Sequence, residues 1–207
     1  MGLIKDFIEH LFPKKIRRDN LKITYTLCLG GLCFLCFFVL LISGILLTFY
    51  YEPGDRGYNS ILLLESSVFG GIFLRSIHRY ASDSLLIFLI LHIIRVIFQG
   101  AYLPPRSTNW LTGCVLFLLC FFEAYLGYVL VQDQVSIWAL KTGMELLNFT
   151  FLTRIIYNLI VVDGVFGELT FTRIYILHII IIPFLILILC SMHIYKIRKQ
   201  KGILPYI

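Results

Sequence analysis

Charged residues are scarce in this sequence. Only 14% of the 207 residues are Asp, Glu, Lys or Arg, against about 25% in an average soluble domain. Together with an apolar fraction of 59%, this shortage argues against a soluble, disordered, fibrous or disulfide-stapled protein. We therefore expect a protein that crosses a membrane several times.

Motifs that signal particular chemistries are also missing. The chain lacks Cys-x-x-Cys-His, the usual haem c attachment motif, and its six cysteines all lie in apolar stretches, which argues against disulfides. Without a P-loop or a Gly-x-Ser-x-Gly motif, nucleotide chemistry and acyl transfer have no support. The net charge of +6 does not by itself predict a nucleic-acid partner, because in a membrane chain the distribution of charge matters more than its size.

Long apolar stretches predict four transmembrane helices, since a span needs about 20 apolar residues. The expected spans cover residues 23–51, 77–102, 110–131 and 174–195, and they form a four-helix domain over residues 23–207. Residues 1–22 predict an interfacial amphipathic helix followed by a basic segment. The loop 132–170 is expected to form short helices on the outer surface.

The distribution of Lys and Arg predicts the topology. Eleven basic residues lie in the N-terminal segment, the loop between spans two and three, and the C-terminal tail, whereas the other side holds six, mixed with acids. Because cytoplasmic segments carry the excess of Lys and Arg, both termini are predicted on the cytoplasmic side of the membrane.

Four of the five histidines lie inside the predicted spans, where an ionisable side chain is costly and usually functional. His78 and His92 are 14 residues apart in span two, and His178 and His193 are 15 apart in span four. Both spacings are close to whole helical turns, so each pair faces one side, about 21–22 Å apart along the axis. Spans two and four run in the same direction, which places His78 level with His178 and His92 level with His193. Each level would supply two axial imidazoles to one haem iron, and two such haems predict electron transfer across the bilayer.

Glycines recur at the same depths in the other two spans. Gly30 and Gly44 are 14 residues apart in span one, as are Gly113 and Gly127 in span three. Glycines in membrane helices commonly allow close helix packing. Their agreement in depth with both histidine levels favours a second role, in which a flat macrocycle approaches the helix backbone.

At these residues the chain resembles a cytochrome b, specifically the short four-helix cytochrome b6 type of the bc/b6f quinol–cytochrome c oxidoreductase superfamily. The matching segments are Cys28-Leu-Gly-Gly31 and residues 48–51, 75–79, 91–95, 172–178 and 192–200. The 14 and 15 spacings, and the end of the sequence soon after span four, point to the b6 type.

The resemblance implies roles for individual residues. His78 and His178 would ligate an outer, low-potential haem b, and His92 and His193 an inner, higher-potential one. Cys28 would attach a further haem through a single thioether, although considered alone it is a packing residue. Four arginines would lie near haem propionates or the inner quinone site, and at least three of them also fit ordinary interfacial anchors: Arg75, Arg79, Arg106 and Arg198. No catalytic residue is assigned.

The resemblance also implies the activity and the partners. The chain would be the cytochrome b subunit, inactive alone, of an enzyme that oxidises quinol outside, passes one electron to a Rieske iron–sulfur protein, and returns the other through both haems to quinone while protons are translocated. The expected partners are a c-type cytochrome, a subunit-IV-like membrane protein and membrane lipid, and the complex is expected to be a homodimer. The subunit-IV-like protein would carry a Pro-Glu-Trp-Tyr-type motif, which this sequence lacks. The alternative is a di-haem anchor for a peripheral dehydrogenase, which would need neither Cys28 nor a Rieske partner. A haem-free scaffold is disfavoured by the four matched histidines.

Two features depart from the family pattern. After Gly127-Tyr128 the family usually has Leu-Pro-Trp, whereas this chain continues Val129-Leu130-Val131-Gln132, so the outer quinol pocket is expected to differ in shape. Asp83 and Glu123 are unexpected acids roughly 6–8 Å inward of the outer haem level. Each is either a proton-binding group linked to that haem or a neutral acid bonded to a neighbouring helix, and Asp83 points about 140° away from His78, toward a possible partner subunit.

Overall fold

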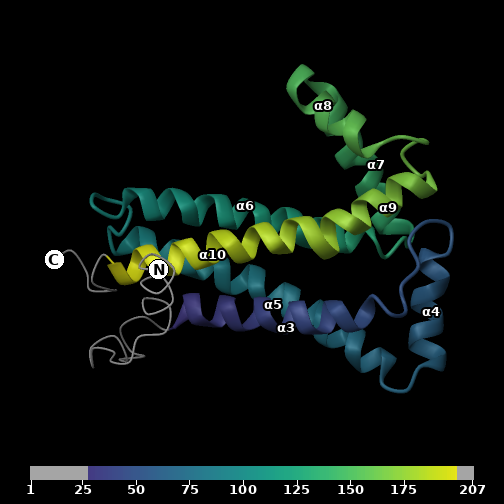
Figure 1. Cartoon of the computed structure of the whole chain (residues 1–207), viewed down its shortest axis with the longest axis horizontal. Coiled ribbons are helices and arrows are strands. Elements are labelled where there is room, and N and C mark those ends of the chain that lie inside the picture. Colours follow the sequence, from purple (N-terminus) through teal and green to yellow (C-terminus); the bar gives the residue numbers. More distant parts are fainter. Residues whose placement is uncertain (1–27, 200–207) are drawn as a thin grey trace, which may run out of the picture. The chain divides into compact units, whose positions relative to one another are not determined.

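The computed structural model describes residues 28–199, and all elements assigned in that range are helical (Figure 1). In chain order they are α3 (Leu29–Leu47), α4 (Gly57–Ser67), α5 (Gly71–Phe98), α6 (Ser107–Val129), α7 (Gln134–Phe149), α8 (Phe151–Ile160), α9 (Glu168–Ile176), the π-helical turn η2 (Leu177–Ile181) and α10 (Ile182–Lys199). The predicted all-α membrane fold is confirmed. The interfacial helix predicted in residues 1–22 lies outside the described residues.

Within residues 28–199, four helical segments are long and apolar enough to cross a membrane, as predicted. They are Leu29–Leu47, Gly71–Phe98, Ser107–Val129 and Glu168–Lys199, the last of which combines α9, η2 and α10. Their outward faces carry large apolar side chains, for example Leu35 at 57% exposed and Ile45 at 62%. In water such faces would be a liability, whereas lipid is their natural solvent.

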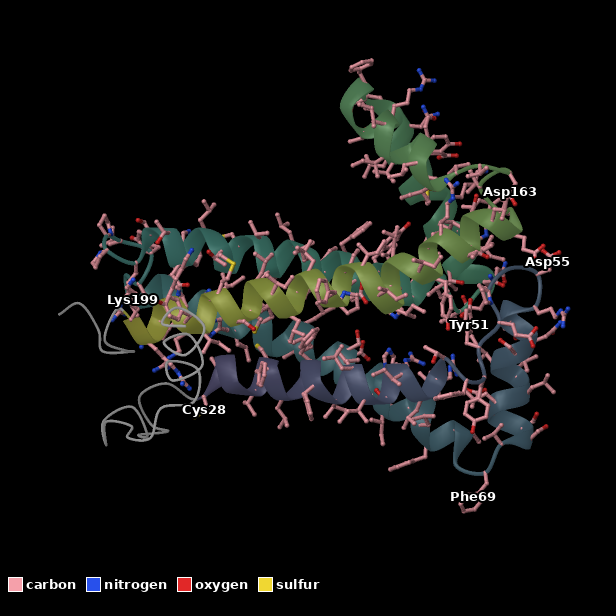
Figure 2. The ribbon with its side chains drawn as sticks, in the orientation of Figure 1. Cys28, Tyr51, Asp55, Phe69, Asp163 and Lys199 are labelled. Carbon is pink, nitrogen blue, oxygen red and sulfur yellow. The ribbon has the colours of Figure 1, made fainter. Side chains whose placement is uncertain are left out.

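The second and fourth spans begin earlier than hydropathy predicts, at Gly71 rather than 77 and at Glu168 rather than 174. Apolar runs mark only the part of a helix in hydrocarbon, while polar contacts extend the helix beyond it. The carboxylate of Asp163, labelled in Figure 2, accepts hydrogen bonds from the backbone N–H groups of Leu169 at 2.8 Å and Thr170 at 3.1 Å. These bonds satisfy free donors at the start of α9.

The segment between α6 and α7 replaces the expected Leu-Pro-Trp with a left-handed turn. Gln132 has φ 57°, and Asp133 then caps α7 by accepting a hydrogen bond from Ser136 N at 2.8 Å. The Gln132 side chain lies against Gly57, where an added Cβ would lie 2.4 Å from its Oε1. The backbone thus leaves α6 without a proline. The loop 132–170 contains α7 and α8, in agreement with the short helices predicted there.

The chain divides into two compact units. Of the described residues, unit 1 comprises 28–37, Asp83–Cys120 and 184–199, and unit 2 comprises Phe38–Ser82 and Phe121–Pro183. Each of the four membrane-crossing segments therefore contributes one part to each unit. His92 and His193 belong to unit 1, and His78 and His178 belong to unit 2.

Candidate functional sites

Unit 2 brings together the two histidines that were predicted to share the outer level. The rings of His78 on α5 and His178 in η2 have centroids 6.3 Å apart and planes inclined at 81°. Two metal–nitrogen bonds of about 2 Å each, plus about 1 Å from each nitrogen to its ring centre, span roughly 6 Å. The separation therefore fits one metal ion between two imidazoles.

The predicted glycines of unit 2 face these histidines. A Cβ on Gly44 of α3 would lie 3.2 Å from Cε1 of His78, and a Cβ on Gly127 of α6 would lie 2.7 Å from Cε1 of His178. Any side chain at either position would therefore press on an imidazole ring. The helix backbones come close to the rings because both positions are glycine.

Polar groups approach the Nδ1 atom of both rings in unit 2. The hydroxyl of Ser43 donates to the carbonyl of Val39 at 2.7 Å, so its oxygen accepts from Nδ1 of His78 at 2.9 Å. Nδ1 of His178 lies 2.9 Å from Oε1 of Glu123, although the ring N–H and the oxygen are not in line. The hydrogen bond at Nδ1 of His78 leaves its Nε2 available to a metal, and an aligned bond from Glu123 would do the same for His178.

His178 lies in the π-helical turn η2, one residue into it. Pro183 follows in the first turn of α10, and a proline can neither donate its nitrogen nor tolerate the carbonyl of the residue four positions earlier. The wider turn relieves that clash and absorbs one extra residue. This accounts for the spacing of 15 between His178 and His193 where the other pair has 14.

Unit 1 repeats the arrangement of histidines and glycines. His92 on α5 and His193 on α10 are close enough to interact electrostatically. A Cβ on Gly30 of α3 would lie 3.3 Å from Cε1 of His92, and one on Gly113 of α6 would lie 3.3 Å from Cε1 of His193. Both units therefore place one glycine from α3 or α6 against each histidine.

The surroundings of Nδ1 are different in unit 1. Nδ1 of His193 is buried beside the backbone of Asn109 and makes no hydrogen bond of normal geometry to the part of the chain that the structure describes. Nearby, Lys196 donates from Nζ to Oγ1 of Thr112 at 2.9 Å, which ties α10 to α6.

Cys28 is exposed immediately before α3, with φ 47° (Figure 2). Next to it in sequence, Leu29 lines a groove of about 290 Å³ together with residues of α5 and the following turn, namely Leu91, Ile94, Arg95, Phe98 and Gln99. Arg95 is the one charged residue in this lining.

The four arginines predicted near propionates or the inner quinone site have different environments. Arg75 forms an ion pair with Glu65 of α4, and Arg79 is exposed on α5. Arg106 is half-buried between α5 and α6, and Arg198 is exposed at the end of α10. The ion pair of Glu65 with Arg75 was not predicted, because nothing in the sequence indicates that α4 turns back toward α5.

Ser43 is another functional candidate that sequence reasoning missed. Its only sequence signal is its position next to Gly44, since a serine in an apolar helix commonly bonds its own backbone. Ser43 does so, and its oxygen also reaches His78.

Together, four membrane-crossing helices and two histidine–glycine clusters define the class of four-helix membrane cytochromes. The comparison with known families is more specific. The family model described as Cytochrome b/b6/petB matches residues 15–201, and the chain belongs to this family.

Similar proteins agree with this assignment. The chain is 34% identical to a cytochrome b6 of Heliomicrobium gestii over 199 residues, which are 95% of this chain and 90% of the relative. It is 30% identical to the menaquinol:cytochrome c reductase cytochrome b subunit of Bacillus subtilis over 199 residues, covering 95% and 89% of the two chains.

A solved chain of a hyperthermophilic respiratory complex III shares the fold, with a TM-score of 0.79, 22% identity and 99% of this chain covered. This chain spans about half of that one, 54%. The family model and the two relatives confirm the predicted family. The protein is an integral membrane cytochrome b, an electron-transfer subunit of a bc/b6f-type enzyme complex.

Proposed function

We propose that the chain binds two b haems, one in each unit, and conducts electrons between quinone-reactive sites on the two sides of the membrane. His78 and His178 are the proposed ligands in unit 2, and His92 and His193 in unit 1. The observation that carries this proposal is the 6.3 Å separation of the His78 and His178 rings, each backed by a glycine.

A bound haem would supply reversible one-electron transfer at its iron. The protein residues hold and tune that group. The four imidazoles would hold the haem irons, the four glycines would let each haem approach the helix backbones, and the apolar helices would exclude water. Four arginines are proposed to lie on the propionate or quinone side: Arg75, Arg79, Arg106 and Arg198. Arg75 would then interact with both a propionate and Glu65.

The proposed substrate is quinol, oxidised with the help of partner subunits, because one relative belongs to a menaquinol:cytochrome c reductase. The proposed partners are a subunit-IV-like protein, a Rieske protein and a c-type cytochrome, in a homodimeric complex. The proposed orientation places both termini on the cytoplasmic side, supported by eleven basic residues against six. Within the chain, residues 1–22 are the proposed interfacial segment and residues 23–207 the haem-binding domain.

A third haem, attached to Cys28 by one thioether, is part of the proposal. Two features support it: Cys28 is exposed immediately before the start of α3, and the adjoining groove contains Arg95, which would pair with a carboxylate.

The test is a pyridine haemochrome assay of the purified complex before and after acid–acetone extraction. We expect two haems b to be extracted and one haem to remain on this chain, and the remaining haem to vanish in Cys28→Ser. Complete extraction from the wild-type chain would remove Cys28 from the proposal and leave a two-haem cytochrome. Absence of haem b would contradict the proposal as a whole.

A further inference from the structure

Glu123 of α6 is not among the residues of the proposed function. It is a carboxyl group inside a membrane-crossing helix, where an ionisable side chain is costly and requires a partner. Its side chain is only 16% exposed, and its Oε1 lies 2.9 Å from Nδ1 of His178, which is 18% exposed. The contact is therefore largely shielded from solvent, and polar interactions are stronger in such surroundings than in water.

The backbone of α6 determines this contact. Glu123 and Gly127 are four residues apart and share one face of the helix. Gly127 brings the backbone so close that a Cβ there would lie 2.7 Å from Cε1 of His178. One face of α6 thus meets the same imidazole at two points, its ring edge and its Nδ1.

We propose that Glu123 is a positioning residue for His178, accepting the Nδ1–H hydrogen bond and directing Nε2 to the haem iron of unit 2. This inference rests on the proposed role of His178 as a haem ligand. The N–H and the oxygen are not yet in line, but the terminal torsion of a glutamate is soft, so alignment needs only a small rotation.

Unit 1 shows why this contact matters. Among its described residues the only carboxyl belongs to Asp83, which is exposed on α5. A carboxyl acceptor makes an imidazole a stronger donor to iron and favours the ferric state, so it lowers the reduction potential of the haem. Glu123 would therefore separate the potentials of two haems that otherwise have the same kind of ligands.

The experiment is a potentiometric titration of the haem α bands, with EPR of the ferric haems, in the purified complex carrying Glu123→Leu. We expect the preference of the unit 2 haem for ferric over ferrous iron to fall about tenfold. For a one-electron couple this raises its reduction potential by about 59 mV. Its EPR g values should change as well, since they depend on the angle between the axial rings, which is 81° here. The unit 1 haem should keep its potential and spectrum.

Two further variants make the result specific. Glu123→Gln retains an acceptor oxygen of similar length, so its potential should lie between those of the wild type and Glu123→Leu, with the original EPR signal. Asp83→Asn removes the exposed in-span carboxyl and should shift neither haem. A shift in Asp83→Asn as large as that in Glu123→Leu would contradict the proposal, because it would reveal a general charge effect.

The role of Glu123 can fail separately from the haem-ligand function. If His178→Leu loses the unit 2 haem while Glu123→Leu leaves its potential and EPR signal unchanged, the positioning role is wrong and the ligand assignment survives. If His178→Leu keeps that haem, the proposed function itself is wrong.

Discussion

Units 1 and 2 are built from parts of the same four membrane-crossing segments, and each places two histidines against two glycines. They differ in what approaches Nδ1 of the rings. In unit 2 these groups are the Ser43 hydroxyl and the Glu123 carboxyl, and in unit 1 the backbone of Asn109 lies beside His193. The two units thus repeat one arrangement of histidines and glycines with different polar groups around it, which would give two chemically alike haems unequal electron affinities. We expect the unit 2 haem to have the lower potential, so that electrons pass from unit 2 to unit 1.

The largest expected difference between the units comes from removing one proposed haem ligand from one of them. We expect His178→Leu to lose the unit 2 haem and His193→Leu to lose the unit 1 haem, each leaving about half of the extractable haem b, because an iron with a single protein ligand is poorly held. The haemochrome assay on each purified variant measures this. If either substitution left both haems in place, the ligand assignment of that unit would be wrong.

A smaller effect is expected from the glycines. Gly127→Ala puts a Cβ 2.7 Å from the His178 ring, whereas Gly113→Ala puts one 3.3 Å from the His193 ring. Overpacking of this kind costs about 1–3 kcal/mol, so Gly127→Ala should lower haem content more than Gly113→Ala does. Gly31→Ala is the matched control on α3, since nothing lies within 4 Å of its Cβ. Equal haem loss in all three variants would show that helix packing, not the ring contact, requires the glycines.

Ser43→Ala is expected to have a smaller effect, on the reduction potential of the unit 2 haem. It removes the oxygen that accepts from His78 Nδ1, but the backbone carbonyl of Leu40 stays within reach as a substitute acceptor. The unit 2 haem should therefore shift upward in potential by less than it does in Glu123→Leu, because a neutral hydrogen bond contributes only about 1 kcal/mol. Potentiometric titration measures the shift, and a larger one than in Glu123→Leu would reverse the proposed order of importance.

The smallest expected effect concerns the start of α9 in unit 2. The backbone N–H of Leu169, together with the hydroxyl and N–H of Thr170, holds the pKa of Asp163 below its usual range. The stabilisation is therefore complete above the ordinary carboxyl pKa and is lost as the pH falls through the lowered value. The protection factors of the Leu169 and Thr170 amides, which correct hydrogen-exchange rates for their intrinsic pH dependence, should fall in acid and, at neutral pH, in Asp163→Ala. Unchanged exchange in the variant would show that Asp163 does not hold this helix start.

Much of this arrangement follows from sequence periodicity. The four spans, and the pairing of each histidine with a partner at its own depth, need only the rise and twist of a helix. The structure places Gly44 against His78 and Gly113 against His193, as the matched depths suggest, while their roles toward haem stay predictions.

The remaining features depend on packing between segments distant in sequence. The Ser43–His78 contact joins residues 35 positions apart, and the ion pair of Arg75 with Glu65 depends on the return of α4 toward α5. Hydropathy carries no information on either. For Glu123, the sequence left a proton-binding role and a bonded acid both open, and both stay predictions, although its Oε1 lies 2.9 Å from Nδ1 of His178. The π-turn beside Pro183 was likewise missed, although the spacing of 15 was its signal.

The most direct test of the account is a spectroelectrochemical redox titration of the purified complex, followed at the haem α bands. For the two haems b, apart from the haem proposed on Cys28, the account predicts two one-electron components of unequal potential. The more negative of these disappears in His178→Leu and the more positive in His193→Leu. A single component in the wild type, or loss of the more positive one in His178→Leu, would contradict the claim that each unit holds one haem with its own potential.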